Sequence, residues 1–501
     1  MSDVQGNPVR RVVIVGGGTA GWMSAALLSK TMGGVLDITL IESDEIGTVG
    51  VGEATIPTMI TFHNLLGLNE AEFMAATNAT FKLGISFENW RDVGQDYIHS
   101  FGTTGTDHWT AGFQHFWLKG RTRGLARNVG DYGDYCRELV AAREGRFAHL
   151  PDNGMNYAYH LDAGAYAKFL RRFSEPLGVK RVEGKIVQVQ QDAESGHVRS
   201  VTLSNGAKVE GDLFLDCSGF RSLLVGETLG VEFEDWSHWL FCDSALAVQT
   251  ESTGAVPPYT RAIAHQAGWQ WRIPLQHRVG NGLVYSSRHL DDEQARELLM
   301  NNLSGAPLMQ PKPIRFKPGQ RRQTWRGNCI AIGLAGGFLE PIESTSIHLI
   351  QRGLIRLLQM FPSGGISQAD VDEYNQQTSA EVTHIRDFII LHYTVNQRQD
   401  SPFWREAREL VLPESLRHRI AHFRETGKIF RGPNELFAEN SWVQVMLGQG
   451  IMPAHYHQIA DLMGDRELQH FLGNIQGSVR GVVEQLPQHA DYLRMYCRAP
   501  A

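Results

Sequence analysis

The segment GGGTAG at residues 16–21 has the glycine spacing that binds the diphosphate of a dinucleotide. It follows Val12–Val15, a β-branched run typical of a parallel strand buried on both faces. Gly16 would allow the tight turn from strand to helix, Gly18 would let a diphosphate approach the backbone, and Gly21 would let the helix pack closely on the sheet. The amides of the two residues between Gly18 and Gly21 would then face the diphosphate.

A second strand and an acid complete this unit. Helix-forming residues continue to Met32, a strand is predicted at Asp37–Ile41, and Glu42 ends that strand, where an acid can bind a ribose hydroxyl. A βαβ unit without a ligand is the alternative. Strand, turn, helix, strand and acid together favour a dinucleotide, either FAD or NAD.

Length and charge narrow the class of protein. With 501 residues, the chain exceeds a typical domain of about 100 to 200 residues, and two or more structural modules are expected. Its 54 acids outnumber its 47 Lys and Arg, and the net charge of −7 argues against nucleic acid, whose phosphates need a basic surface. The N-terminus lacks an apolar signal core and no run of about 18 apolar residues occurs, which predicts a cytoplasmic protein without a membrane partner.

Cysteine and histidine spacing gives no support for a metal. The five cysteines are far apart and form no CxxC pair, so reduced core thiols are expected. The histidines near residues 99–115 show neither HxxxH nor HExxH spacing. The sequence therefore predicts no metal site.

Further along the chain, Lys82 lies in the segment FKLGISF at 81–87. Alternation predicts one amphipathic strand with the apolar side chains on one face and Lys82 on the other. This pattern alone places Lys82 in solvent. The preceding loop has glycines at 47, 50 and 52, which suit either a ligand-binding loop or an ordinary connection.

Two segments are rich in rings. The stretch 97–119 includes His99 and Phe101, and its rings form either part of the core or the wall of a pocket for an aromatic ligand. In WQWRIP at 269–274, Trp269 and Trp271 share one strand face, which is usually a core face.

The remaining pattern predicts an α/β fold. Strands at 185–191, 198–203 and 207–210, with an Asn205-Gly206 turn, form a β-meander of a kind more typical of FAD folds than of NAD folds. A buried strand at Cys329–Ile332 precedes a helix from about Ser344, and residues after 370 read as helical. We expect a discontinuous nucleotide-binding module at 1–365, with insertions at about 60–150 and 226–320, and a helical module at 366–501.

Five ordered motifs resemble one known family. They are GGGTAGW at 16–22, GVGEATIP at 50–57, FKLGISF at 81–87, WQWRIP at 269–274 and FLEPIESTSI at 338–347. In this order they resemble the FAD-dependent halogenases, especially the tryptophan halogenase-like group. The resemblance implies a Rossmann-like FAD-binding fold of the flavoprotein monooxygenase and halogenase type, with a β-meander and a mainly helical substrate-binding module at 366–501.

It also implies a chemistry. Reduced FAD, oxygen and chloride or bromide give hypohalous acid, which reaches Lys82. Lys82, held in an aromatic pocket with a lowered pKa, would hydrogen-bond the acid or be converted to a haloamine, and either route halogenates an electron-rich ring such as indole. Glu343 would stabilise the cationic ring and assist proton removal, although an acid near a helix start has a simpler capping role.

The remaining site residues follow from the same resemblance. Thr345 and Ser346 would bind halide through their amides at a helix start, although the family usually has Gly at the second position. Trp269 and Trp271 would screen the flavin from the substrate. The family's flavin contacts correspond to Gly16, Gly18, Thr19, Ala20, Gly21, Glu42, Ala54, Val187, Leu334 and Ile347.

Partners and substrate are expected as follows. A single nucleotide fingerprint favours a separate NAD(P)H-dependent flavin reductase over a single-component aromatic hydroxylase, and Lys82 with Glu343 argues against a non-catalytic flavoprotein. Ser441 and Trp442 stand where tryptophan-specific members have two tyrosines, and no clamp for an amino acid follows. The pocket walls would be His99, Phe101 and Trp442, and indole or a larger indole or phenolic compound should react better than tryptophan. The oligomeric state is open between monomer and homodimer.

Overall fold

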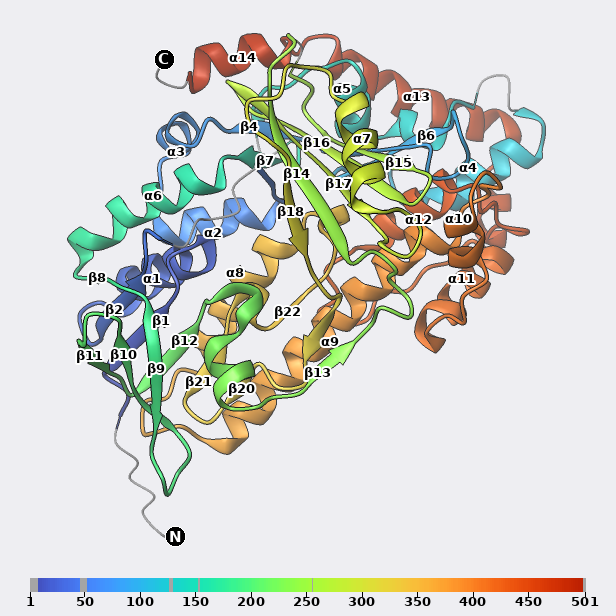
Figure 1. Ribbon diagram of the computed structural model, residues 1–501. Helices are drawn as coiled ribbons and strands as arrows, with labels where there is room; N and C mark the ends of the chain where they lie inside the picture. Colours follow the sequence, from blue (N-terminus) through green and yellow to red (C-terminus); the bar gives the residue numbers. More distant parts are fainter. Residues whose placement is uncertain (1–7, 46–51, 126–128, 152–153, 255, 499–501) are drawn as a thin grey trace.

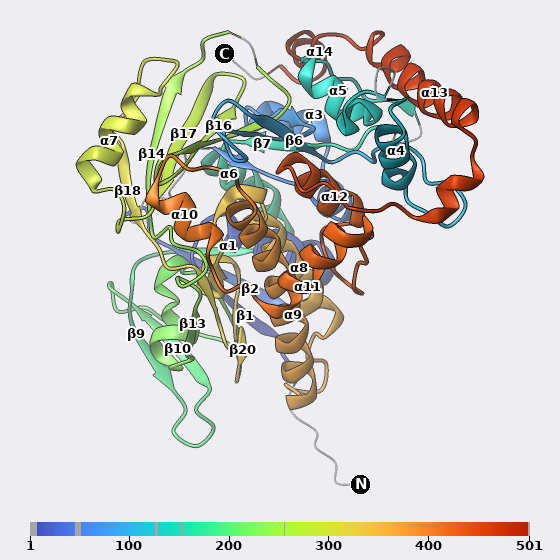
Figure 2. The ribbon, with the colours of Figure 1, turned by 90° about the vertical axis from the view of Figure 1, so that its right-hand side faces the viewer.

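The structure is a computed structural model that describes residues 8–45, 52–125, 129–151, 154–254 and 256–498 (Figure 1). These residues form a mixed α/β arrangement, which confirms the predicted fold class. The β-meander at residues 186–210 lies at one end of the molecule in both views (Figures 1 and 2). The C-terminal helices α13 (Asp465–Val483) and α14 (His489–Tyr496) lie at the opposite end. No helix in the described part is long and apolar enough to cross a membrane.

The dinucleotide-binding unit belongs to a six-stranded sheet with the order β20-β21-β12-β1-β2-β8. Its strands are β1 (Arg11–Val15), β2 (Asp37–Glu42), β8 (Lys180–Glu183), β12 (Leu213–Asp216), β20 (Trp325–Arg326) and β21 (Cys329–Ala331). All neighbours pair in parallel except β20 and β21. Val12–Val15 are buried, as a strand covered on both faces requires. Helix α1 (Thr19–Met32) begins inside the GGGTAG turn and ends at Met32, where the helix-forming residues were predicted to end.

The predicted meander is confirmed. Strands β9 (Ile186–Gln191), β10 (Val198–Leu203) and β11 (Lys208–Glu210) pair in antiparallel register. Gly206 has φ of +84°, which the tight Asn-Gly turn between the last two strands requires.

A seven-stranded sheet with the order β18-β14-β17-β16-β15-β5-β6 forms the other large sheet. Its strands are β5 (Gly84–Glu88), β6 (Asp96–Ser100), β14 (Ser244–Glu251), β15 (Thr260–His265), β16 (Gly268–Pro274), β17 (Arg278–Tyr285) and β18 (Lys312–Arg315). Smaller sheets join β3 (Glu53–Ala54), β7 (Ala158–Leu161) and β4 (Thr80–Lys82), and β13 (Phe233–Asp235), β19 (Gly319–Arg321) and β22 (Gly337–Phe338).

The single amphipathic strand predicted at 81–87 is wrong. The chain leaves β4 at Leu83, whose amide donates to Pro258 O at 2.7 Å, and enters the other sheet as β5. Gly84 lies so close to β6 that a Cβ there would be 2.5 Å from His99 O. Because both faces of this segment are covered, Lys82 is buried rather than solvated.

Besides α1, the described α-helices before residue 366 are α2 (Thr58–Leu66), α3 (Glu70–Ala76), α4 (Phe113–Thr122), α5 (Arg137–Arg143), α6 (Ala163–Ser174), α7 (Asp292–Asn301) and α8 (Ser346–Gln359). After it come α9 (Gln368–Thr394), α10 (Pro402–Arg408), α11 (Glu414–Thr426), α12 (Glu439–Gly448), α13 and α14, in agreement with the helical reading. The two largest apolar clusters each contain residues from both parts. The division into modules at 365 stays an interpretation.

Helix α9 joins the two large sheets. Near its start, Asn375 Oδ1 accepts hydrogen bonds from the amides of Thr324 and Trp325 at the edge of the six-stranded sheet. At its end, Tyr393 packs against Trp90 and Trp404 beside the seven-stranded sheet. Its 27 residues correspond to about 40 Å of helix. The residues at its C-terminal end are thereby carried to the site described next.

Candidate active site

A cavity of about 940 Å³ lies between the two large sheets and is at the upper end of the size of ligand pockets. Eight of the residues predicted to bind the cofactor line it: Gly16, Gly18, Thr19, Ala20, Glu42, Ala54, Leu334 and Ile347. The cavity also reaches residues of the seven-stranded sheet. One space therefore joins the glycine-rich turn to Trp269 and Trp271, the rings predicted to screen the flavin.

The glycine-rich turn fits a dinucleotide diphosphate. Gly16 has φ of +115°, and a Cβ there would lie 2.3 Å from Cys217 O. Around Gly18 a Cβ would meet no atom within 4 Å, which leaves room for a ligand at this point of the backbone. Helix α1 has no side-chain cap, so its first amides can bind an anion. Gly21 has a packing role, because a Cβ there would lie 1.8 Å from Gly16 O.

Glu42 lies at the expected end of β2, at the cavity wall. Its Oε2 accepts a hydrogen bond from Trp22 Nε1 at 3.1 Å, and its Oε1 pairs with Arg181. These two contacts hold the carboxylate at the position where a ribose hydroxyl is expected. Trp22 directly follows the GGGTAG turn, and its role was not apparent from the glycine spacing.

Val187 does not line the cavity. Its side chain is 61% exposed, whereas the neighbouring Ile186 belongs to the lining. The alternation of β9 turns adjacent side chains to opposite faces, so a shift of one residue changes the face. The structure therefore favours Ile186 for a side-chain contact at this point.

Lys82 is fully buried and tied to residues from two other segments. Its Nζ donates to Thr55 O at 3.0 Å and to Ser344 Oγ at 2.8 Å, and it lies 5.2 Å from the centre of the Phe101 ring. Burial lowers the pKa of Lys82 to about 7, although the charge of Glu343 partly opposes this shift. At neutral pH both the ammonium and the amine are populated.

Glu343 is buried between two histidines. Its carboxylate oxygens lie 3.0 Å from His99 Nδ1, and Oε1 lies 2.7 Å from His392 Nε2. Burial by itself would raise the pKa of Glu343, but His99 and His392 outweigh it and lower the pKa to about 2. The carboxylate is therefore ionised. His99, predicted as a pocket wall, is also a direct partner of Glu343.

Thr345 and Ser346 line the cavity at the start of α8. The helix begins at Ser346, two residues after the predicted start, because Ser344 adopts a left-handed φ of +59°. No side chain caps this helix, so the first amides are available to an anion. This arrangement suits the halide site that the resemblance implies.

Trp269 and Trp271 share one face of β16, as predicted, and both line the cavity. Their ring centres are 6.2 Å apart. Trp269 Nε1 donates to Glu340 Oε2 at 3.1 Å, which fixes its ring. Among the described residues, Trp271 Nε1 has no hydrogen-bond partner.

The rings predicted to contact the substrate are not all in one layer. Phe101 lies beside Lys82, and His99 beside Glu343. Trp442 packs edge-on against Phe388, with ring centres 4.8 Å apart, and Phe388 lies 5.6 Å from His99. Trp442 therefore supports the site from behind Phe388.

Sequence reasoning missed Phe388 and His392, which occupy positions i and i+4 of α9. Their rings meet edge-on at 5.4 Å. A search for polar residues on the apolar stripe of this helix could have found His392. Elsewhere, the five cysteines are buried and free, as expected. In the described ranges, no cluster of three or more His, Cys, Asp or Glu could hold a metal.

Comparison with known proteins identifies the family. The tryptophan halogenase profile matches residues 11–465. Tryptophan 7-halogenase RebH of Lentzea aerocolonigenes is 35% identical over 97% of this chain and 98% of its own length. Xcc4156, a flavin-dependent halogenase from Xanthomonas campestris, superposes with a TM-score of 0.97 at 64% identity, covering 99% of this chain and 100% of that one.

BrvH, a flavin-dependent halogenase from Brevundimonas sp. BAL3, superposes with a TM-score of 0.94 at 46% identity, covering 98% of this chain and 99% of its own. The expected Rossmann-like FAD-binding fold is thereby confirmed, and the hydroxylase and non-catalytic alternatives are set aside. The chain therefore belongs to the tryptophan halogenase family, whose flavin-dependent members are enzymes that use reduced FAD and a halide.

Proposed function

We propose that this enzyme halogenates indole or an indole derivative, and that Lys82 and Glu343 are its catalytic residues. One observation supports the proposal most strongly. An aromatic-walled site next to the cavity holds a buried lysine with a pKa of about 7 and a buried carboxylate. Ser344, the residue that follows Glu343, accepts from Lys82 and also lines the cavity. Ser344 therefore lies between the cavity, where the oxidant would form, and Lys82, where it would react.

The cavity residues would hold FAD, with the turn at 16–21 at its diphosphate and Glu42 at its ribose. Bound reduced flavin would activate oxygen by reducing it. The activated oxygen would then oxidise a halide to hypohalous acid. Thr345 and Ser346 would hold the halide at the start of α8. Trp269 and Trp271 form an apolar wall that separates this chemistry from the organic substrate and excludes water.

Lys82 directs the oxidant in one of two ways. As an ammonium, it donates a hydrogen bond to hypohalous acid, which polarises the bond from oxygen to halogen. As an amine, it attacks the halogen, so that an N–halogen bond forms, the O–halogen bond breaks and water leaves. A pKa of about 7 makes both forms accessible at neutral pH. Either route places one electrophilic halogen beside Phe101.

Glu343 acts on the ring. When the ring carbon forms its bond to halogen, the ring becomes cationic, and a buried carboxylate stabilises that charge. The carboxylate then accepts the proton from the substituted carbon, and the electrons of the C–H bond restore the aromatic ring. His99 and His392 keep Glu343 ionised for both steps.

The substrate is proposed from the described residues of α12. Ser441 and Trp442 stand at the start of α12, where tryptophan-specific members are expected to carry two tyrosines, and Trp442 is buried behind Phe388. A zwitterion bound without partners for its charges would cost several kcal/mol. A neutral indole carries no such charges, and it matches the apolar walls.

A direct assay tests the function. Indole is incubated with the enzyme, FAD, a separate flavin reductase, NADH and bromide, and the products are analysed by mass spectrometry. Bromoindole that depends on the enzyme and on bromide is expected. We propose a reaction without a metal, so EDTA should not lower the yield of bromoindole. Hydroxyindole, or no product, would contradict the proposal. Dependence on an NAD(P)H reductase also fits a cytoplasmic enzyme.

A further inference from the structure

The end of α9 carries two consecutive residues that contact the segment 340–343. His392 Nε2 lies 2.7 Å from Glu343 Oε1, which is an ion-pair distance, but its N–H direction does not meet the geometry of a hydrogen bond to any described residue. Tyr393 donates its hydroxyl hydrogen to Glu340 Oε2. The side chains of consecutive helical residues point about 100° apart, so His392 and Tyr393 contact the segment 340–343 from two directions. The carboxylate of Glu343 therefore has its orientation set by a helix that does not itself line the cavity in the described structure.

A hydrogen-bond chain on the far side of His392 fixes which ring nitrogen carries the proton. Gln449 Nε2 donates to His392 O at 2.9 Å and to Tyr97 Oη at 3.3 Å. Because the Tyr97 oxygen accepts from Gln449, its own hydrogen is free for His392 Nδ1, which is 2.9 Å away. Burial raises the pKa of Tyr97 well above its usual value, and the charge of Glu343 adds to this, so the phenol keeps its hydrogen.

With Nδ1 accepting, the proton of a neutral His392 must reside on Nε2, which faces Glu343. Burial lowers the pKa of His392, although its contact with Glu343 opposes the shift. We propose that Tyr97 and His392 are positioning residues, which hold the Glu343 carboxylate ionised and correctly oriented by keeping a protonated Nε2 close to Oε1. This inference rests on the proposed role of Glu343.

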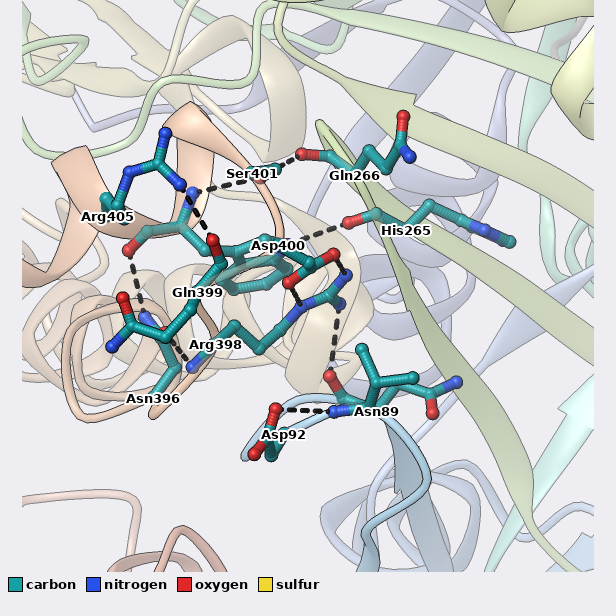
Figure 3. Close-up of polar contacts among 12 residues, drawn as sticks. Asn89, Asp92, His265, Gln266, Asn396, Arg398, Gln399, Asp400, Ser401 and Arg405 are labelled. Carbon is teal, nitrogen blue, oxygen red and sulfur yellow. Dashed lines mark hydrogen bonds and ion pairs between the residues drawn. The ribbon is translucent and has the colours of Figure 1, made fainter.

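The end of α9 is itself anchored to the seven-stranded sheet (Figure 3). Arg398 pairs with Asp400 at 2.6 Å and donates to Asn89 O at 3.1 Å, beyond the end of β5. Asn396 Nδ2 donates to Tyr393 O at 2.6 Å. Ser401 Oγ donates to Gln266 O at 2.6 Å, in the turn between β15 and β16. These contacts fix the position from which His392 reaches Glu343.

The first test compares the kinetics of His392→Ala with those of His392→Gln. Alanine removes the donor, whereas the side-chain N–H of Gln can occupy the place of Nε2–H. We expect His392→Ala to lower kcat by 10- to 100-fold, since small displacements of a catalytic group cost this much, with KM for indole nearly unchanged. His392→Gln should recover most of the loss. His384→Ala, on the same helix but partly exposed and 3.9 Å from Glu435, is the matched control and should keep the wild-type rate.

The pH profile provides a readout that loss of packing would not change. The charged and titratable groups around Glu343 are His99, His392, Lys82 and Tyr97. Removing His392 Nε2–H should raise the pKa of Glu343. The fall of kcat at low pH should therefore begin at a higher pH in His392→Ala, and in His392→Gln it should begin at the same pH as in the wild type. An unmoved limb, or a Gln variant no better than the Ala variant, would overturn the inference.

The tautomer can be observed without flavin or turnover. In protein labelled with ¹⁵N-histidine, the wild-type resonances that are missing from the spectrum of His392→Gln belong to His392. Their chemical shifts should be those of an Nε2-protonated ring. Tyr97→Phe removes the hydroxyl, and the Nδ1-protonated form should then appear. An Nδ1-protonated His392 in the wild type would overturn the inference.

Glu343→Gln separates this inference from the proposed function. If Glu343→Gln keeps the wild-type rate, then the role of Glu343 fails and the inference fails with it. If Glu343→Gln is slow while His392→Ala is fast, only the positioning role fails.

Discussion

Lys82 Nζ donates a hydrogen bond of 2.8 Å to Ser344 Oγ, although 262 residues separate the two in the chain. Ser344 follows Glu343 directly, and its φ of +59° turns the chain into α8. This contact fixes the lysine relative to the carboxylate and to the start of the helix. The lysine and the glutamate thus form one rigid unit.

Replacing Lys82 with Ala should abolish halogenation while flavin oxidation and the release of hypohalous acid continue. The lysine acts after the oxidant has formed, and it does not line the cavity. Bromoindole and free hypobromous acid are measured in the same reaction. A variant that halogenates at a rate near that of the wild type would refute the role of Lys82.

Replacing Lys82 with Met should stabilise the protein. Burial lowers the pKa of Lys82 from 10.5 to about 7, so the unfolded chain binds a proton more readily than the folded chain, and stability falls as the pH falls from about 10.5 to 7. At 1.36 kcal/mol per pKa unit, removing the amine should gain about 4 kcal/mol at pH 7, less the contribution of the lost hydrogen bonds. Scanning calorimetry should show a higher Tm at pH 7 and a smaller gain at pH 10. Lys312→Met, at an exposed position, is the control and should not change the Tm.

Replacing Glu343 with Gln should lower the halogenation rate by about 10²-fold, which is within the range for a positioned base. An amide can neither accept the ring proton nor balance the cationic ring. FAD affinity, followed by flavin fluorescence, should change little, because Glu343 is not part of the cavity lining. An unchanged rate would reduce Glu343 to an acid near the start of a helix.

Glu70 should contribute stability that is lost in acid. It accepts from Tyr157, Tyr159 and Tyr496, and it lies 3.1 Å from His149. Burial opposes ionisation, but these donors prevail and lower its pKa from 4.5 to about 2. The contribution, about 3 kcal/mol, is present above pH 4.5 and disappears as the pH falls to about 2.

Chemical denaturation of Glu70→Gln, compared with the wild type at pH 7 and at pH 3, tests this contribution. The difference in free energy of unfolding should be larger at pH 7, whereas the exposed Glu72→Gln should show little difference at either pH. An equal loss at both pH values would show that the ionisation of Glu70 does not matter. Other acids with low pKa values, such as Glu381, are present in both the wild type and the variant, so their contributions to the difference in free energy of unfolding cancel.

Indole should outcompete tryptophan. In one reaction with equal concentrations and bromide, bromoindole is expected in at least tenfold excess, because the charges of tryptophan would be desolvated without partners. Liquid chromatography with mass detection measures both products. A reaction without enzyme corrects for free hypobromous acid. An excess of bromotryptophan would contradict the proposed substrate.

Local patterns in the chain were enough to predict several elements. The β-branched run before GGGTAG specifies a buried strand, and the Asn205-Gly206 pair specifies the hairpin of the meander, because both depend on neighbouring residues. The ordered motifs were sufficient to indicate the family, whereas the roles that they suggest for Lys82 and Glu343 stay predictions.

The tertiary structure alone decided the surroundings of these residues. Alternation predicted one strand at 81–87 and a solvated lysine, but contacts with Pro258 and His99 divide the strand and bury Lys82. Nothing local marks His392 as the partner of Glu343, since the two meet only when the end of α9 is anchored against the sheet. Burial then lowers the pKa of Lys82, and the two histidines lower that of Glu343, because desolvation and charge depend on atoms that are remote in the chain.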